Sequence, residues 1–248
     1  MRIDQPDQAQ IPELLQMWKD AFGEYGGFWE MFLRTAFLQE HCRCVTVDGQ
    51  AAAALYWFDG SCGGQKTAYI YAVVTRPEYR GKGLCRVLLE DTHAHLKAQG
   101  YAGAVLKPAS GLFPFYTRLG YVTSGYISRF TASAGSVPIH LKDLSSKEYG
   151  LLRKTYLPEN GIVQEGITLN YLRTFAKFYA CEDAIVCTSR EEPVIFEYLG
   201  NPHSAPGILA ALGIQSAEIP TVGNDIPFAM FYPLNCTKIP GYLGISLE

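Results

Sequence analysis

The chain has 248 residues, of which 48% are hydrophobic and 18% are charged, so it can bury a sizeable core. The formal net charge is -3 and there is no long basic run, which disfavours a general nucleic-acid-binding protein. Residues 1–10 are polar, and no later stretch approaches the ~20 apolar residues of a membrane-spanning helix. We therefore expect a globular protein with no nucleic-acid partner and no membrane partner.

The first half of the chain has the pattern of a complete α/β unit. Apolar residues at helical spacing predict helices, and short β-branched or aromatic runs between turn signals predict strands. Asp48-Gly49 predicts a hairpin, and Gly100 stands where a helix C-cap is expected. The predicted elements are helices 9–21 and 28–38, strands 44–47, 52–58 and 68–75, helix 84–99, strand 102–106, helix 112–119 and strand 121–130.

The second half begins at a stretch of small residues with linker composition, 131–138. Its opening order of two helices followed by two strands repeats the order of the first half, although no residue-level repeat supports a duplication. The predicted elements are helices 146–156 and 167–178, strands 184–188 and 194–198, helix 205–212, and strands 217–222, 227–232 and 242–247. We expect two domains, residues 1–130 and a smaller α/β domain at residues 131–248.

The glycine-rich segment after strand 68–75 carries the chemistry. Glycines at 81 and 83 stand among Arg80, Lys82 and Arg86, between a predicted strand and a predicted helix. Exposed backbone N–H groups and the positive end of a helix dipole favour an anion there, and glycine lets the backbone approach a pyrophosphate closely. A dinucleotide-binding fingerprint would need a third glycine at 86, and a P-loop would need Lys-Ser/Thr after its last glycine, so both of these phosphate loops are excluded.

The segment Pro77 to Cys85 resembles the Arg/Gln-x-x-Gly-x-Gly/Ala signature of the GCN5-related N-acetyltransferase (GNAT) superfamily, with Cys85 in place of the final small residue. Residues 115–121, Phe-Tyr-Thr-Arg-Leu-Gly-Tyr, resemble the family's Phe-Tyr-x-x-Leu-Gly-Phe segment, so the resemblance covers residues 9–130. It implies a GNAT fold, a mixed and mostly antiparallel sheet flanked by helices, for residues 1–130. The smaller second half is then a candidate degenerate GNAT-like copy.

The resemblance also implies the site. Backbone groups of the strand would pair with the pantetheine arm of acetyl-CoA like an added strand, and the loop amides would bind its pyrophosphate. The implied cofactor-binding residues are Val73, Val74, Thr75, Arg80, Gly81, Lys82, Gly83, Leu84, Cys85 and Arg86. The implied function is N-acetyl transfer from acetyl-CoA to a primary amine by direct attack, with no metal.

Tyr116 is the implied general acid, which would protonate the departing CoA thiolate; it could equally be an aromatic core residue beside Phe115 and Tyr121. Transfer of a proton from a tyrosine near pKa ~10 to a thiolate near ~8.5 is uphill by about 2 kcal/mol, which catalysis tolerates. The base that deprotonates the acceptor is not identified. Glu24 and Glu30 have the pattern of solvated helical residues, and similarity to Eis-type acetyltransferases adds the terminal carboxylate of Glu248 as a weaker candidate.

Other signals point away from a second chemistry. Seven cysteines at irregular spacing, with no signal peptide, indicate reduced thiols and a cytoplasmic location. Cys42-x-Cys44 has no second ligand pair for zinc, and His93 and His95 fall on different faces of a helix, where we expect surface or interface positions.

The alternative function is a non-catalytic acyl-CoA-binding regulatory or scaffold module. The acceptor, a small molecule or a peptide, stays open, as does a homodimer.

Overall fold

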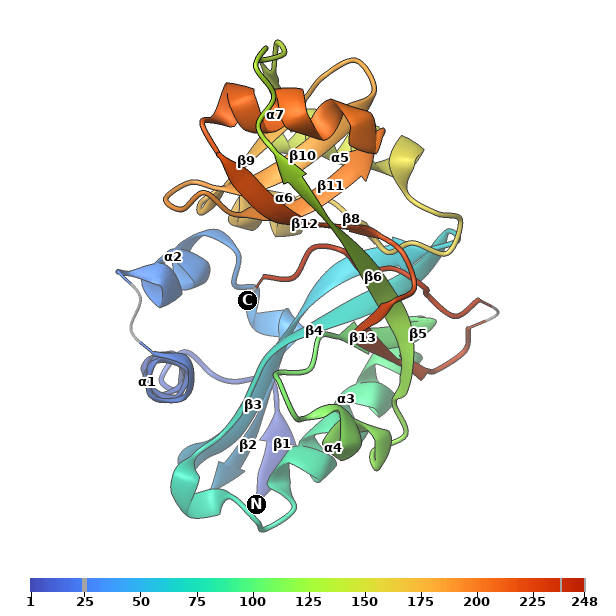
Figure 1. Cartoon of the computed structure of the whole chain (residues 1–248). Coiled ribbons are helices and arrows are strands. Elements are labelled where there is room, and N and C mark those ends of the chain that lie inside the picture. Colours follow the sequence, from blue (N-terminus) through green and yellow to red (C-terminus); the bar gives the residue numbers. More distant parts are fainter. Residues whose placement is uncertain (24–25, 237, 248) are drawn as a thin grey trace. The chain divides into compact units, whose positions relative to one another are not determined.

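The computed structural model describes residues 1–23, 26–236 and 238–247 (Figure 1). The chain forms two compact units. The first contains residues 1–59, 65–106 and 232–236, and the second contains residues 60–64, 107–231 and 238–247. Residues 60–64 of the first half belong to the second unit, and residues 232–236 of the second half belong to the first unit. A division into domains 1–130 and 131–248 therefore stays a prediction.

The first unit is built on a mixed sheet in the order β1-β2-β3-β4-β5. Strands β1, β2 and β3 pair antiparallel, whereas β4 and β5 pair parallel. The strands are β1 (Arg2–Asp4), β2 (Cys42–Val47), β3 (Gln50–Cys62), β4 (Gln65–Thr75) and β5 (Gly103–Leu106). The helices are α1 (Ile11–Phe22), α2 (Phe28–Thr35) and α3 (Leu84–Ala98), with short 3-10 turns at Gln39–His41 and Pro77–Tyr79.

Helices cover both faces of this sheet, which explains the long apolar run in β3. Successive strand side chains point to opposite faces. Tyr56 and Phe58 contact the ring of Phe32 on α2, and Trp57 between them contacts His95 on α3. The sheet is therefore buried on both sides, with α1 and α2 on one face and α3 on the other (Figure 1).

The second unit has a sheet in the order β13-β6-β12-β11-β10-β9-β7. The β11–β12 pair is parallel, and the pairs that β6 and β10 make with their neighbours are antiparallel. The strands are β6 (Val122–Ser133), β7 (Lys142–Asp143), β8 (Val163–Gln164), β9 (Ala176–Ala180), β10 (Ala184–Ser189), β11 (Ile195–Gly200), β12 (Ser216–Val222) and β13 (Ile226–Pro233). Strand β8 pairs with Gly60 and Ser61 at the end of β3.

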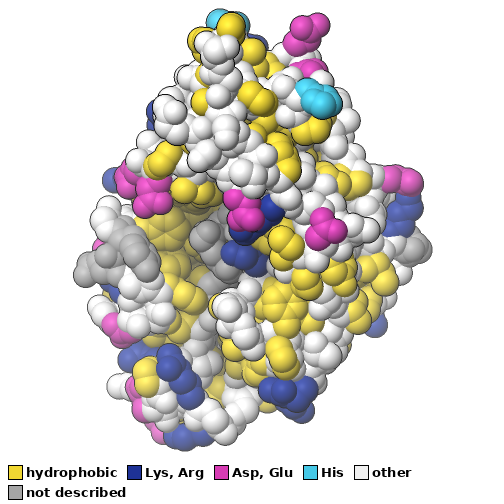
Figure 2. All heavy atoms as spheres, viewed as in Figure 1, with side chains coloured by type: hydrophobic (Ala, Val, Ile, Leu, Met, Phe, Trp, Pro, Cys, Tyr) yellow, Lys and Arg dark blue, Asp and Glu magenta, His cyan; other side chains and the backbone are white. Residues whose placement is uncertain are grey.

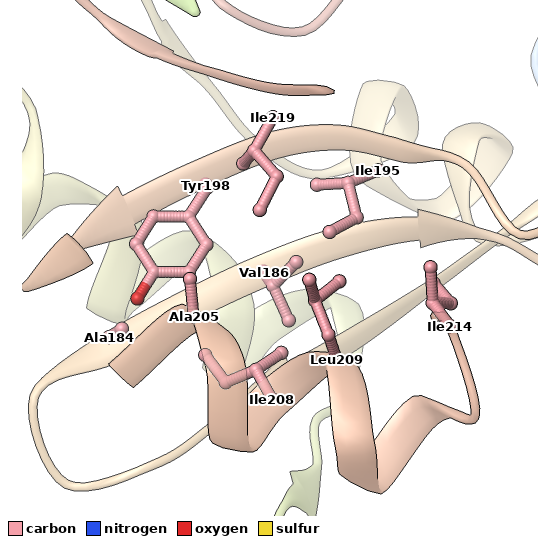
Figure 3. Packing of buried hydrophobic residues seen from close by; sticks show 9 residues of the cluster. All are labelled: Ala184, Val186, Ile195, Tyr198, Ala205, Ile208, Leu209, Ile214 and Ile219. Carbon is pink, nitrogen blue, oxygen red and sulfur yellow. The ribbon is translucent and has the colours of Figure 1, made fainter. Parts of the chain in front are cut away.

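Helices also cover both faces of the second sheet. They are α4 (Phe113–Thr117), α5 (Ser146–Tyr156), α6 (Ile167–Leu172) and α7 (Ala205–Leu212), with a 3-10 turn at Pro202–Ser204. Helix α7 packs Ile208 and Leu209 onto Val186, Tyr198 and Ile219 of the sheet (Figure 3). On α5, Tyr149 stacks on Phe178 of β9, with ring centroids 4.3 Å apart.

Two predicted elements of this half are wrong. The helix predicted at residues 167–178 ends at Leu172, and Ala176–Ala180 instead forms β9, which pairs with β10. The strand predicted at 242–247 is irregular apart from one bridge, Gly161 to Tyr242. The backbone N–H of Ile162 donates to Tyr242 O, and after that residue two carbonyls accept side-chain hydrogen bonds: Arg153 donates to Leu243 O and Gln164 to Ile245 O.

Candidate active site

The loop between β4 and α3 has the geometry of an anion site. Gly81 and Gly83 have φ angles of 74° and 79°, in the left-handed region that disfavours residues with a Cβ. Gly83 is the N-cap of α3, and the first intrahelical bond runs from Val87 N to Gly83 O. The N–H groups of Leu84, Cys85 and Arg86 precede that bond, so helix geometry leaves them available at the positive end of the dipole.

Cations surround this loop. Arg80, Lys82 and Arg86 are exposed, and Figure 2 shows Lys and Arg side chains at the lower end of the view, where Figure 1 draws the segment after β4. Arg80 donates from Nε to the carbonyl of Thr75 at 3.0 Å, and Lys82 Nζ lies 5.2 Å from the centre of the Tyr79 ring. Both contacts are made by the charged groups themselves, and both side chains remain exposed beside the loop, where they could form charge-assisted hydrogen bonds to an anion.

Cys85 is a half-buried thiol in the first turn of α3, and burial raises its pKa to about 11. A thiol with that pKa is protonated near neutral pH, so it is a poor nucleophile. Cys85 is therefore not suited to covalent chemistry in this loop.

Strand β4 extends beyond the end of its pairing with strand β5. Their parallel pairing runs from Thr67 and Gly103 to Tyr69 and Val105, whereas β4 continues to Thr75. Past that point no described residue of β5 pairs with β4, and a strand edge can offer N–H and C=O groups at regular spacing to another extended segment. The predicted cofactor-binding residues Val73, Val74 and Thr75 all lie in this stretch.

The same stretch begins at an irregular residue. Ala72 has a φ angle of 53°, and its carbonyl accepts a hydrogen bond of 3.0 Å from the indole Nε1 of Trp18 on α1. The sequence pattern placed Trp18 in the apolar stripe of the first helix, which is correct, but it gave no indication of this polar contact. The sequence around Ala72 does not indicate its backbone conformation.

Tyr116 lies on α4 in the second compact unit, whereas all ten predicted cofactor-binding residues lie in the first. Its side chain is buried and packs edge-to-face against Phe115 and Tyr121, at centroid distances of 5.1 and 5.5 Å. The aromatic-core reading of Tyr116 is therefore correct as far as its packing goes. Its assignment as general acid rests on the motif and stays a prediction.

Two carboxylates considered from the sequence, Glu24 and the C-terminal Glu248, lie outside the described residues. Glu30 is exposed and forms an ion pair with Lys19, and hydrogen bonding to that lysine lowers the pKa of the Glu30 carboxyl. A carboxylate with a lowered pKa is a weaker base, which argues against Glu30 as the group that deprotonates an acceptor.

The residues discounted for metal binding have other surroundings. Cys42 and Cys44 are buried in β2, and burial raises the pKa of the Cys44 thiol to about 12. We expected surface or interface positions for both helical histidines, and a surface position is wrong for His93, which is buried and stacks on Tyr232. His95 faces Trp57. Within the described part of the chain, no group of three or more His, Cys, Asp or Glu side chains could hold a metal ion.

Every helix among the described residues is too short or too polar to cross a bilayer.

The C-terminal segment of the second unit is held by a buried charge network. Arg153 forms a bidentate ion pair with Glu197, with bonds of 2.7 and 2.9 Å, and both side chains are almost fully buried. Tyr149 and Tyr242 also donate hydrogen bonds to the Glu197 carboxylate. A buried pair satisfied in this way specifies one position for the irregular segment at residues 242–245.

Comparison with known proteins agrees with this geometry. Residues 2–123 match the family model of an acetyltransferase (GNAT) domain. No curated protein matches the sequence.

Solved structures with the same fold cover nearly the whole chain. A GCN5-related N-acetyltransferase from Kribbella flavida has a TM-score of 0.71 at 18% identity, over 94% of this chain and 72% of that one. A GCN5-related N-acetyltransferase from Anabaena variabilis ATCC 29413 has a TM-score of 0.73 at 17% identity, over 94% and 73%. Eis1 from Mycobacterium abscessus has a TM-score of 0.68 at 10% identity, over 95% and 74%. The fold likeness therefore includes the second compact unit.

Proposed function

We propose that the protein transfers the acetyl group of acetyl-CoA to a primary amine. The proposal starts from the match of residues 2–123 to a GNAT acetyltransferase domain. The observation that carries the proposal is the junction of β4, the Gly81-Lys82-Gly83 turn and the α3 N-terminus. It lies inside the matched region and combines free helix-terminal amides with three exposed cations.

In this proposal the amides from Gly81 to Arg86 bind the pyrophosphate of CoA, and Arg80, Lys82 and Arg86 neutralise its charge. The left-handed φ angles of the two glycines support this, because they turn successive N–H groups outward without a side chain in the way. The positive end of α3 adds to the attraction.

The pantetheine arm would lie along β4 at Val73, Val74 and Thr75, where the pairing with β5 has already ended. Backbone hydrogen bonds to that arm would hold the thioester in register with the strand. Strand N–H groups near the thioester would then stabilise the oxyanion that forms as the amine attacks.

Tyr116 would protonate the CoA thiolate as it leaves, a transfer uphill by about 2 kcal/mol with unshifted pKa values. The amine attacks the thioester carbonyl directly, the C–S bond breaks, and the thiolate takes the tyrosine proton. The raised pKa of Cys85 supports this order, because a covalent acyl-cysteine would need a thiolate.

The acceptor must lose a proton before attack. An alkylamine near pKa ~10.4 is neutral in only about one molecule in 2,500 at pH 7. Because Glu30 is paired with Lys19, we do not assign this proton to Glu30, and another base or a water relay must accept it.

Calorimetry with a matched pair of glycine variants tests the cofactor site. Gly83→Glu places a carboxylate at the pyrophosphate position, and Gly100→Glu makes the same change at another left-handed glycine of the first unit. An added Cβ at either position meets no atom within 4 Å, so both variants carry the same backbone strain and the same charge change.

We expect acetyl-CoA to bind the wild type and Gly100→Glu with similar affinity, and Gly83→Glu at least about 100-fold more weakly because of charge repulsion. Release of free CoA thiol with a panel of amines then measures turnover. Binding without turnover with any amine would favour the acyl-CoA-binding module, and absence of wild-type binding would refute the acetyltransferase.

A further inference from the structure

Ala72 in β4 has an uncommon backbone conformation. Among the described residues, two that are not glycine have a positive φ angle, Asp48 and Ala72. Asp48 stands in the Asp-Gly turn between β2 and β3, where this conformation is expected. Ala72 lies inside a strand, where a left-handed residue with a Cβ persists only if its surroundings enforce it.

The side chain that binds the Ala72 carbonyl is Trp18. Its indole N–H donates a buried hydrogen bond of 3.0 Å to the carbonyl of Ala72, across 54 positions of sequence. The indole itself cannot shift, because it is fully buried and packs on Trp29 and Phe32 with ring centroids 5.6 and 5.4 Å away. A rigid donor therefore fixes the direction of the Ala72 carbonyl.

Helix α1 also contacts the chain on the C-terminal side of Val73 to Thr75. Glu13, in its first turn, accepts a hydrogen bond from the Ala51 amide at 2.8 Å and pairs with Arg76 at 3.4 Å. Trp18 thus holds β4 just before Val73, and Glu13 holds it just after Thr75. The three residues assigned to the acyl arm lie between these two attachment points.

We propose that Trp18 is a positioning residue for acetyl transfer: its indole N–H holds the Ala72 carbonyl in the left-handed turn of β4, and so directs the backbone groups of Val73 to Thr75 toward the thioester. This role rests on the proposed function. It acts on the orientation of the acyl group and leaves the pyrophosphate loop, Gly81 to Arg86, unchanged. The signature is a fall in kcat with little change in CoA affinity.

Three variants test the role. Trp18→Phe removes the N–H and keeps an aromatic ring in the cluster. Trp29→Phe is the matched control, because it removes an indole N–H from the same cluster, where Trp29 donates to Gly23 O. Trp18→Phe combined with Ala72→Gly tests rescue, because glycine adopts a positive φ without the help of a donor.

We expect Trp18→Phe to lower kcat for acetyl transfer at least about tenfold, as small misplacements of reacting groups do. The Kd for CoA should stay within about twofold of wild type, and Trp29→Phe should keep both values within about twofold. Ala72→Gly in the Trp18→Phe background should restore at least about half of the lost activity, whereas a purely structural role of Trp18 predicts a further loss.

Equal kcat values for the two phenylalanine variants, or a double variant no more active than Trp18→Phe, would overturn the positioning role while leaving the acetyltransferase intact. If wild type binds no acetyl-CoA, both the function and the role fail. Should Trp18→Phe not fold, Ala72→Val reaches the same turn from β4, because a β-branched residue resists a positive φ. It should lower kcat at unchanged CoA affinity, and unchanged kcat in that variant would overturn the role.

Discussion

Acid should destabilise the first compact unit through His93. This histidine is 5% exposed and stacks on Tyr232 with ring centroids 3.8 Å apart, and burial lowers its pKa from 6.5 to about 4. His93 is therefore protonated near pH 6.5 in the unfolded chain, but only near pH 4 in the folded chain. The stabilisation is fully present above pH 6.5 and is lost as the pH falls toward 4.

Integrating between those two pKa values gives a loss of about 2 kcal/mol between pH 7.5 and pH 5, and about 3 kcal/mol by pH 4. Burial also lowers the pKa of His41 and of His95, so the loss in wild type should exceed the part that belongs to His93. The share of His93 is isolated by His93→Gln, which keeps a polar side chain but cannot take up a proton in this range.

Urea unfolding followed by circular dichroism at pH 7.5, 6 and 5 measures the effect. His93→Gln should lose about 2 kcal/mol less than wild type over that interval, and His203→Gln, at an exposed histidine, should lose as much as wild type. Equal losses in wild type and His93→Gln would refute the reasoning, since they would mean that His93 is protonated in the folded protein at pH 5.

Three further predictions concern other parts of the chain. Tyr116→Phe should lower kcat about 100-fold with an unchanged Kd for acetyl-CoA, measured by thiol release and calorimetry, and wild-type kcat would exclude Tyr116 as the general acid. Glu197→Gln leaves Arg153 buried without its counter-ion and should destabilise the second unit by about 3–5 kcal/mol in urea. The same change at the exposed Glu218 should cost no more than about 0.5 kcal/mol, and equal costs would contradict the argument. Alkaline pH should destabilise the fold, because burial raises the pKa of Cys44 from 9.0 to about 12, so about 2–3 kcal/mol of the free energy of unfolding is lost by pH 11. Cys44→Ala should lose about 2–3 kcal/mol less than wild type over that range. The same pH dependence of unfolding in Cys44→Ala and wild type would contradict this prediction.

Sequence reasoning recovered the parts of the site that depend on local chemistry. The glycines at 81 and 83 predicted a turn between a strand and a helix, and both lie between β4 and α3. The apolar stripe from Leu84 to Leu96 predicted the helix that follows, and α3 is that helix. Such features are set by neighbouring residues, so a short window of sequence contains the information that determines them.

Where the elements of the second half were misjudged, partners distant in the sequence decided the outcome. Residues 176–180 have an apolar pattern compatible with a helix, but pairing with β10 makes them a strand. The segment after Tyr242 has the composition of an edge strand, yet Arg153 and Gln164 bind its carbonyls and keep it irregular. Tertiary hydrogen bonds outweigh a weak local preference in both places.

The sequence by itself determined the α/β composition, the glycine turn between a strand and a helix, and the resemblance that the family model supports, because each depends on residue types at short fixed spacings. Only the tertiary structure decided the left-handed turn at Ala72 and the indole that holds it, the end of the β4–β5 pairing at Tyr69, and the burial of His93. These features depend on hydrogen bonds and packing between segments that are far apart in the chain, and a short window of sequence does not contain the information about those contacts.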